Sequence, residues 1–249
     1  MANWSDPRPG LAPVGARTDT RGVTYDAGLR AYMLSVYNYM ASAVLLTGIV
    51  AMGVFYSGAY TALISATGRG LSGLGWIVTL APLGIVFAMS FGQQRMQTGT
   101  LQALFWAYAT LLGASFSVLF LAYTNASIAG AFFATAAGFA GLSLYGYTTE
   151  RNLTAMGSFL IVGLIGLIVA MLVNTFLHSG PMALVISVVG VLIFAGLTAY
   201  DTQRTKSMYS YVAGTENEGR AKIMSALNLY LDFINMFLFI LRLFGSSRN

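Results

Sequence analysis

The chain has 249 residues, of which 57% are hydrophobic and only 8% charged, and its mean hydropathy is +0.70. Soluble domains carry about 25% charged residues, so a water-soluble fold of this composition would expose large apolar areas. The net charge of +5 comes from scattered basic residues, which is not a nucleic-acid-binding pattern. The absence of cysteine excludes disulfides, thiolate metal sites and cysteine nucleophiles. Composition therefore predicts an integral membrane protein whose solvent is the lipid bilayer.

Residues 1–28 are polar, contain Pro and Gly, and lack the apolar run of a signal peptide. We expect them to form a disordered cytoplasmic tail, with residues 29–249 forming a single membrane domain. The first membrane helix would then act as the insertion signal.

Seven apolar stretches follow, each close to the ~20 residues that an α-helix needs to cross a bilayer. They cover residues 32–56, 76–92, 100–122, 126–146, 153–177, 181–203 and 222–244. Only three residues separate the third stretch from the fourth, which predicts a tight helical hairpin. Pro82 is expected to kink the second helix, and Pro181 marks the first turn of the sixth. The pattern predicts an all-α membrane protein with a seven-transmembrane helix bundle.

Small residues also indicate how one helix packs. In the fourth stretch, the pairs Ala134–Gly138 and Ala137–Gly141 place small residues four positions apart. Such spacing lets helix backbones approach closely, so we expect this face to pack tightly against a neighbour.

Lys and Arg set the orientation, because they accumulate in cytoplasmic segments. With a cytoplasmic N-terminus, ten of the 13 basic residues lie inside and three lie outside. The inside set is Arg8, Arg17, Arg21, Arg30, Arg95, Arg151, Arg204, Lys206, Arg220 and Lys222. The outside set is Arg69, Arg242 and Arg248. We therefore predict a cytoplasmic N-terminus and, after seven spans, a C-terminus outside.

Two acidic residues fall inside apolar stretches: Asp201 near the inner end of the sixth helix and Asp232 near the middle of the seventh. An ionised carboxylate at the bilayer centre costs at least ~2.5–3.5 kcal/mol, so such a residue indicates a functional site. Ser225, Asn228, Asp232 and Asn235 are spaced 3, 4 and 3 apart and share one helix face. This polar stripe predicts that the seventh helix is central or pore-lining.

The two aspartates form the candidate site. If they approach closely, like-charge repulsion prevents both from ionising and they share one proton. The pair would then act as a pH switch and, once deprotonated, as a hard oxygen site for Ca²⁺. The alternative is that each carboxyl merely caps or hydrogen-bonds a neighbouring helix. Asp232 lies ten residues past Lys222, or ~15 Å along a helix, so contact requires the seventh helix to be offset toward the cytoplasm.

Three segments resemble the Bax inhibitor-1 family. They are Ala-Tyr-Asp-Thr-Gln at 199–203, Leu-Tyr-Leu-Asp-Phe-Ile-Asn at 229–235 and Leu-Arg-Leu-Phe-Gly at 241–245. The resemblance implies seven helices with the last in the centre, wrapped by the other six. It also implies a pH-sensitive Ca²⁺ leak in which the paired aspartates are sensor and gate. In that family a basic residue at the cytoplasmic end of helix two latches the helix-six aspartate; Arg95 is the nearest candidate, and its alternative role is a topology-setting loop charge.

Two functions follow from these residues and the resemblance. The first is a pH-sensitive Ca²⁺-permeable leak channel in a cell (inner) membrane, with Ca²⁺ as the permeant ion and no cofactor. The second is a non-transporting membrane regulator of a membrane-bound protease or of a stress or cell-death pathway. An enzyme is not expected. Gly70-Leu71-Ser72-Gly73 matches the serine motif of intramembrane proteases and His178 is a conceivable base, but both fall in predicted loops.

Overall fold

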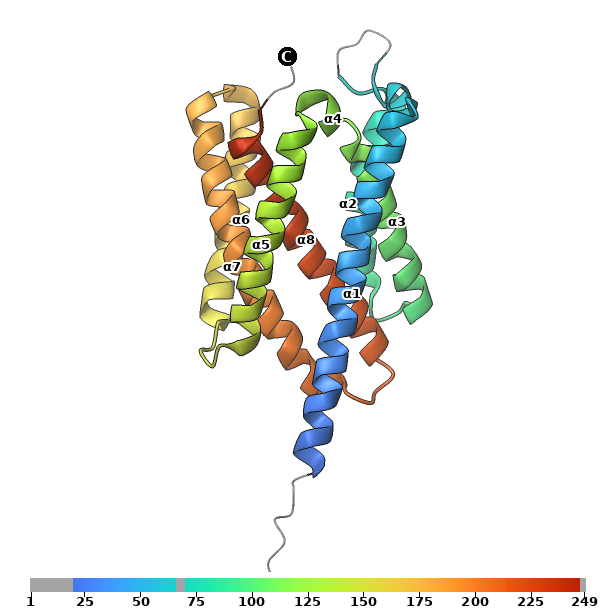
Figure 1. Ribbon diagram of the computed structural model, residues 1–249, viewed down its shortest axis with the longest axis vertical. Helices are drawn as coiled ribbons and strands as arrows, with labels where there is room; N and C mark the ends of the chain where they lie inside the picture. Colours follow the sequence, from blue (N-terminus) through green and yellow to red (C-terminus); the bar gives the residue numbers. More distant parts are fainter. Residues whose placement is uncertain (1–19, 66–69, 247–249) are drawn as a thin grey trace, which may run out of the picture.

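The computed structural model describes residues 20–65 and 70–246 of the chain (Figure 1). Within these residues, seven helical segments are long and apolar enough to cross a membrane. The helices are α1 (Thr20–Tyr56), η1 (Ala59–Leu63), α2 (Gly73–Gly92), α3 (Thr98–Phe116), α4 (Leu119–Ala122), α5 (Asn125–Thr148), α6 (Thr154–Leu177), α7 (Gly180–Val212) and α8 (Glu218–Phe244). The short α4 continues α3, so the two count as one span. The predicted all-α, seven-helix membrane fold is confirmed.

Three helix ends differ from the predicted ones. Helix α1 begins at Thr20, so residues 20–28, predicted to be disordered, are helical; residues 1–19 lie outside the described part of the chain. Helix α7 continues to Val212 rather than ending at residue 203, and α8 begins at Glu218. Hydropathy marks the part of a helix that lies in the bilayer, whereas a 33-residue helix is ~50 Å long and projects beyond ~30 Å of hydrocarbon.

Four basic residues at or beyond the predicted ends of the sixth and seventh stretches lie on helices in the structure. Arg204 and Lys206 lie on α7, and Arg220 and Lys222 lie in the first turns of α8. The connection between the two helices is only residues 213–217. The four charges therefore have fixed positions on helices instead of belonging to an irregular loop.

Helix α8 is the central element. In Figure 1 it crosses the bundle diagonally, between α1, α2 and α3 on one side and α5, α6 and α7 on the other. In its most apolar stretch 61% of the residues are buried inside the bundle, against 11% in that of α6. Its main contacts are with α1, α3, α5 and α7, whereas α2 packs mainly on α3, and α6 on α7. The C-terminal helix is thus central, although four helices rather than six form its principal surroundings.

Aromatic side chains fill the space around α8. The Tyr230 ring packs edge-on against Phe105 and Tyr108, with ring centroids 6.2 and 5.6 Å away. Its hydroxyl pairs with Thr47 Oγ1 at 2.7 Å, which satisfies a polar group that would be costly to bury alone. This packing holds α8 against α1 and α3.

The close helix approach involving α5 occurs on a different face from the predicted one. Gly146 lies directly against the Ala199 backbone of α7, leaving no room for a Cβ. Gly138 and Gly141 instead have open space around them, so the expected tight packing at these two glycines is wrong. The buried face of α5 carries Ala131, Thr135, Phe139, Ser143 and Gly146; the small-residue pairs lie on the other, lipid-facing side of the helix.

This difference gives a test of the packing. We expect Gly146→Leu to lower the free energy of unfolding by about 3 kcal/mol, because the larger side chain overpacks the α5–α7 contact. Gly138→Leu is the matched control on the same helix and should have little effect. The measurement is unfolding of the purified protein in detergent; equal effects of the two substitutions would contradict the described packing.

The orientation of the bundle remains a prediction, and the cysteine-free chain makes it easy to test. Helix α1 begins at the end of the bundle opposite to that where α8 finishes (Figure 1). We expect a cysteine introduced by Ser57→Cys to react with a membrane-impermeant thiol reagent in intact cells. Glu150→Cys, at the opposite end, should react only after the membrane is permeabilised. The reverse pattern would place the N-terminus outside.

Candidate functional site

Asp201 on α7 and Asp232 on α8 come together in the centre of the structure. Their carboxyl groups lie within hydrogen-bonding reach of each other. Asp232 is only 4% exposed and Asp201 is half-buried. Among the described residues, Asp232 Oδ2 is a buried oxygen without a hydrogen-bond partner. The structure thus contains a contact between two acidic groups inside an apolar bundle.

The length of α7 explains how the two residues meet. Asp201 lies 11 residues before the end of α7, and Asp232 lies 14 residues after the start of α8. At 1.5 Å per residue these separations are ~17 and ~21 Å. The two carboxyl groups therefore reach nearly the same depth from a short connection. No offset of α8 is needed, because α7 extends beyond its predicted end.

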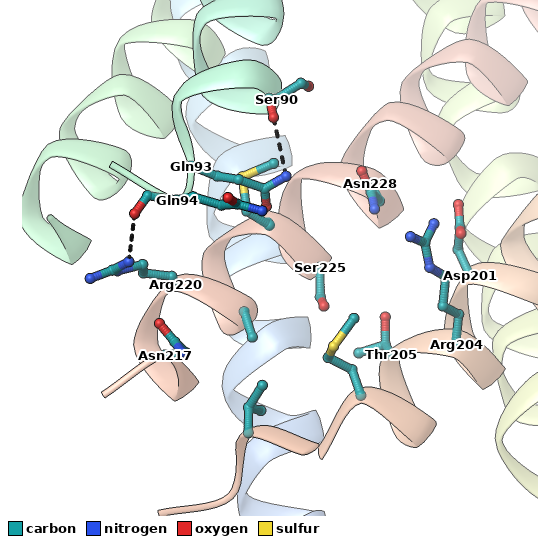
Figure 2. Close-up of a pocket in the computed structure, with 14 residues that line it drawn as sticks. Ser90, Gln93, Gln94, Asp201, Arg204, Thr205, Asn217, Arg220, Ser225 and Asn228 are labelled. Atoms are coloured by element: carbon teal, nitrogen blue, oxygen red, sulfur yellow. Dashed lines mark hydrogen bonds between the residues drawn. The ribbon is translucent and has the colours of Figure 1, made fainter. Parts of the chain in front are cut away.

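Two cavities meet at the pair. The first, which we call the polar cavity, has a volume of about 660 Å³ and lies between α2, α7 and α8 (Figure 2). The second, the aspartate cavity, has a volume of about 380 Å³ and lies between α6, α7 and α8. Both are lined by Asp201, Arg204 and Asn228. Asp201 therefore stands at the junction, while Asp232 lines the aspartate cavity only.

The polar stripe of α8 faces these cavities along its whole length. Ser225 lines the polar cavity, Asn228 lines both, and Asp232 and Asn235 line the aspartate cavity. The Asn235 amide nitrogen donates to the Leu231 carbonyl at 2.8 Å, which fixes the orientation of that side chain. The stripe predicted from its 3-4-3 spacing is thus the polar wall of a chain of cavities.

The basic residue at the pair is Arg204 rather than Arg95. Arg204 lies one turn beyond Asp201 on α7, its charge acts on that carboxyl, and Figure 2 shows the two side chains next to each other. Arg220 lines the far side of the polar cavity and donates to the Gln94 carbonyl at 3.1 Å. Arg95 is exposed just after α2 and lies outside the set of side chains that line either cavity. Residues three apart on a helix are neighbours, so the spacing of Asp201 and Arg204 could have predicted this contact. The predicted helix ended at residue 203, before Arg204, and so this contact was missed.

Gln203 explains another part of the Ala-Tyr-Asp-Thr-Gln segment. Its amide nitrogen donates to the Arg151 carbonyl, and its amide oxygen accepts from the Leu153 N–H, both at 2.8 Å. Gln203 thereby attaches the α5–α6 connection to α7, two residues beyond Asp201. This role is structural, and it fixes the frame in which Asp201 sits.

The donor set limits what metal chemistry is available. Among the described residues, no group of three or more His, Cys, Asp or Glu side chains could hold a metal ion. The aspartate cavity offers the two carboxylates together with the Asn228 and Asn235 side chains. Ca²⁺ takes six to eight oxygen ligands, so most of its coordination would have to come from water or backbone.

A third cavity, which we call the C-terminal cavity, lies along α8 toward its C-terminal end. It has a volume of about 590 Å³ and is lined by Arg242, Asn174 and Ser187, among others. Met171 lines both this cavity and the aspartate cavity. Phe194 and Phe239, whose rings stack with centroids 6.0 Å apart, form part of the aspartate cavity wall.

The serine protease motif has a structural explanation. Ser72 caps α2: its Oγ accepts from the Gly75 N–H at 3.0 Å and donates to the Ala62 carbonyl at 2.6 Å. His178 ends α6 in a left-handed conformation with φ of 50°. Figure 1 places α2 and α6 on opposite sides of the bundle, so the two residues do not form a nucleophile–base pair.

Comparison with known proteins identifies the family and several relatives of this chain. The family model for inhibitors of apoptosis-promoting Bax1 matches residues 29–249. An uncharacterized protein of Rickettsia prowazekii is 49% identical over 235 residues, an alignment that covers 93% of this chain and 96% of that protein. An uncharacterized protein of Caulobacter vibrioides is 43% identical over 235 residues, covering 92% and 94%. The inner membrane protein YbhL of Escherichia coli is 42% identical over 224 residues, covering 89% and 94%.

The family match includes all seven membrane-spanning helices and both aspartates. The relatives align over nearly their full lengths, so the likeness extends to the whole membrane domain. This chain is therefore an integral, multi-pass membrane protein that belongs to the Bax inhibitor-1 family.

Proposed function

We propose that the protein is a pH-sensitive, Ca²⁺-permeable leak channel whose gate is the pair of Asp201 and Asp232. The observation that carries the proposal is the contact of the two carboxyl groups at the junction of two cavities. Two acidic groups so close in an apolar setting share a proton, because two adjacent negative charges are unfavourable there. The singly protonated pair links α7 to α8 by a hydrogen bond, which is the closed arrangement.

Loss of the shared proton reverses this interaction. The two carboxylates then repel each other, which weakens the link between α7 and α8, and together they attract a divalent cation. The proposed pH dependence follows from this. Acid conditions keep the pair protonated and closed, whereas a rise in pH favours the open, cation-binding form. Asn228 and Asn235 provide neutral polar groups on either side of the carboxylates along α8.

The sparse ligand set favours passage over storage. A permeant ion must bind well enough to enter but weakly enough to leave. Two carboxylates without a third acidic ligand suit such transient binding. Arg204 and Arg220 line the route from the polar cavity and repel cations, which favours a slow leak over a high-conductance channel.

The cellular location belongs to the same proposal. YbhL is named an inner membrane protein, and the excess of Lys and Arg on one side favours a cytoplasmic N-terminus. We place this protein in the inner membrane of a bacterial cell, with the polar cavity facing the cytoplasm. No enzymatic activity or cofactor is proposed.

Ion flux provides the main test. In liposomes loaded with a Ca²⁺ indicator, we expect uptake through the wild-type protein to increase between about pH 6 and about pH 8, by at most about tenfold per pH unit for a single shared proton. Asp201→Asn and Asp232→Asn should flatten this dependence, because neither variant can form the shared-proton pair. Glu216→Gln, in the exposed α7–α8 connection, is the control and should behave like the wild type.

Flux no greater than that of protein-free vesicles at every pH would overturn the leak proposal. The regulator of a membrane-bound protease would then be the remaining function. It predicts co-purification with its partner and retained regulation in the Asp→Asn variants.

A double-mutant cycle tests the contact independently of transport. Asp201→Asn and Asp232→Asn, alone and combined, should change the free energy of unfolding non-additively, with a coupling of about 0.5–3 kcal/mol. The control pair, Asp26→Asn with Asp232→Asn, should be additive within about 0.5 kcal/mol. Additive effects for Asp201 and Asp232 would show that each carboxyl acts separately, as a helix cap would.

A further inference from the structure

A groove between α1 and α5 lies on the side of the bundle away from α6. It consists of two cavities arranged end to end along these helices. The upper cavity, about 390 Å³, is lined by positions within 44–56 of α1 and 125–133 of α5. The lower cavity, about 500 Å³, is lined by positions within 30–41 of α1 and 139–147 of α5. The two together cover nearly the whole membrane-spanning length of α1.

The groove exists because α1 and α5 are held apart by other helices. Helix α1 packs mainly on α3 and α8, and α5 on α7 and α8. In Figure 1, α8 crosses behind the gap between α1 and α5. Phe233, Ile234 and Phe237 of α8 form part of the wall of the upper cavity.

The walls are apolar and face the surroundings of the bundle. In the lower cavity the lining includes Met33, Leu34, Met40 and Phe139, and Leu34 is 51% exposed. In the upper cavity Ile49 is 63% exposed. In a bilayer, an apolar groove left empty would lose dispersion contacts on every wall, so lipid acyl chains are its natural occupants. Positions 30–56 span ~39 Å, so each cavity matches one leaflet.

Charge distinguishes the two cavities. The lower cavity ends at Arg30, which is exposed and forms no ion pair with any described residue. Tyr147 lines the same cavity, and Lys206 lies over its ring, with Nζ 4.9 Å from the ring centroid. The upper cavity ends instead at neutral groups, where the Asn125 amide donates to the Tyr56 hydroxyl at 3.2 Å. Of the two cavities, only the lower one thus combines an acyl-sized apolar wall with an arginine at its end, and a lysine packs on the Tyr147 that lines it.

We propose that the lower cavity is a binding site for an anionic phospholipid. The phosphate pairs with the Arg30 guanidinium, which presents several N–H donors in a planar fork suited to phosphate oxygens. Lys206, whose Nζ lies over the Tyr147 ring and donates to the Tyr147 carbonyl at 2.8 Å, adds a second positive charge nearby. One acyl chain lies along α1 and α5, over Met33, Met40 and Phe139. A zwitterionic lipid would fill the same groove but gain less from the two positive charges.

Native mass spectrometry of the full-length protein tests this site. The probes are phosphatidylglycerol and phosphatidylcholine with identical acyl chains, added to the delipidated protein in detergent. We expect the wild type to prefer phosphatidylglycerol. Arg30→Gln should reduce phosphatidylglycerol binding about fivefold, because a basic residue near an anionic lipid contributes about 1 kcal/mol, and Arg30→Lys should retain most of it. Arg95→Gln, an exposed arginine at the same end of the bundle, is the matched control.

A second variant separates the groove from the charge. Ala140→Trp fills the lower cavity and should reduce binding of both lipids, whereas Ala134→Trp, on the opposite face of α5, should bind both like the wild type. Glycerol phosphate, which has no acyl chain, should not compete. Equal binding of both lipids by the wild type would overturn the proposal, as would an unchanged preference in Arg30→Gln. Normal binding by a folded Ala140→Trp variant would also overturn it. None of these results depends on ion flux, so the site stands or falls separately from the leak proposal.

Discussion

The contact between two carboxyl groups inside an apolar bundle is the constraint on which the rest of the structure depends. A bilayer offers no water to solvate these groups, and an unpaired charge there is costly. The helices therefore surround the pair with the polar stripe of α8, with Arg204 and with cavities large enough for water. Helix α8 occupies the centre because it carries the group that most needs shielding from lipid: Asp232 is 4% exposed.

Helix α7 makes this contact possible by being longer than the bilayer requires. Because α7 extends to Val212, the chain turns back into α8 well past Asp201. The first 14 residues of α8 then run back along α7 and bring Asp232 level with Asp201. Gln203 fastens the middle of α7 to the α5–α6 connection, and Gly146 lets α5 approach the backbone at Ala199. These contacts flank Asp201 in the chain and leave little freedom for its position. Movement that separates the pair must therefore come largely from α8.

The sequence was sufficient for much of this architecture because the membrane imposes simple rules. Seven apolar stretches gave the seven spans, and the 3-4-3 spacing from Ser225 to Asn235 indicated which helix faces the interior. The ends of α7 and α8 could not be obtained in this way, since the polar parts of a helix carry no hydropathy signal. The predicted sixth stretch consequently ends just before Arg204. The small-residue pairs at Gly138 and Gly141 misled for another reason: spacing shows that two residues share a face but not whether that face meets a helix or lipid. The contact of Asp201 with Asp232 depends on the register of two helices, which only the three-dimensional structure provides.

If the protein is the leak channel proposed above, the arrangement along α8 would keep passage slow in both protonation states. In the proposed leak, an ion moving from the aspartate pair toward the C-terminal cavity passes Met171, which lines both cavities, and the aspartate cavity wall, which includes the stacked rings of Phe194 and Phe239. Apolar side chains offer no ligands to replace its water, and Arg242 beyond them repels cations. On the other side, Arg204 offsets part of the charge that deprotonation creates at Asp201. In the proposed leak, the aspartates would set whether a cation binds, while the apolar side chains and the flanking arginines would limit how quickly it passes. These apolar side chains and arginines are distinct from the aspartate pair, so proton binding in the proposed leak would not have to form the whole barrier.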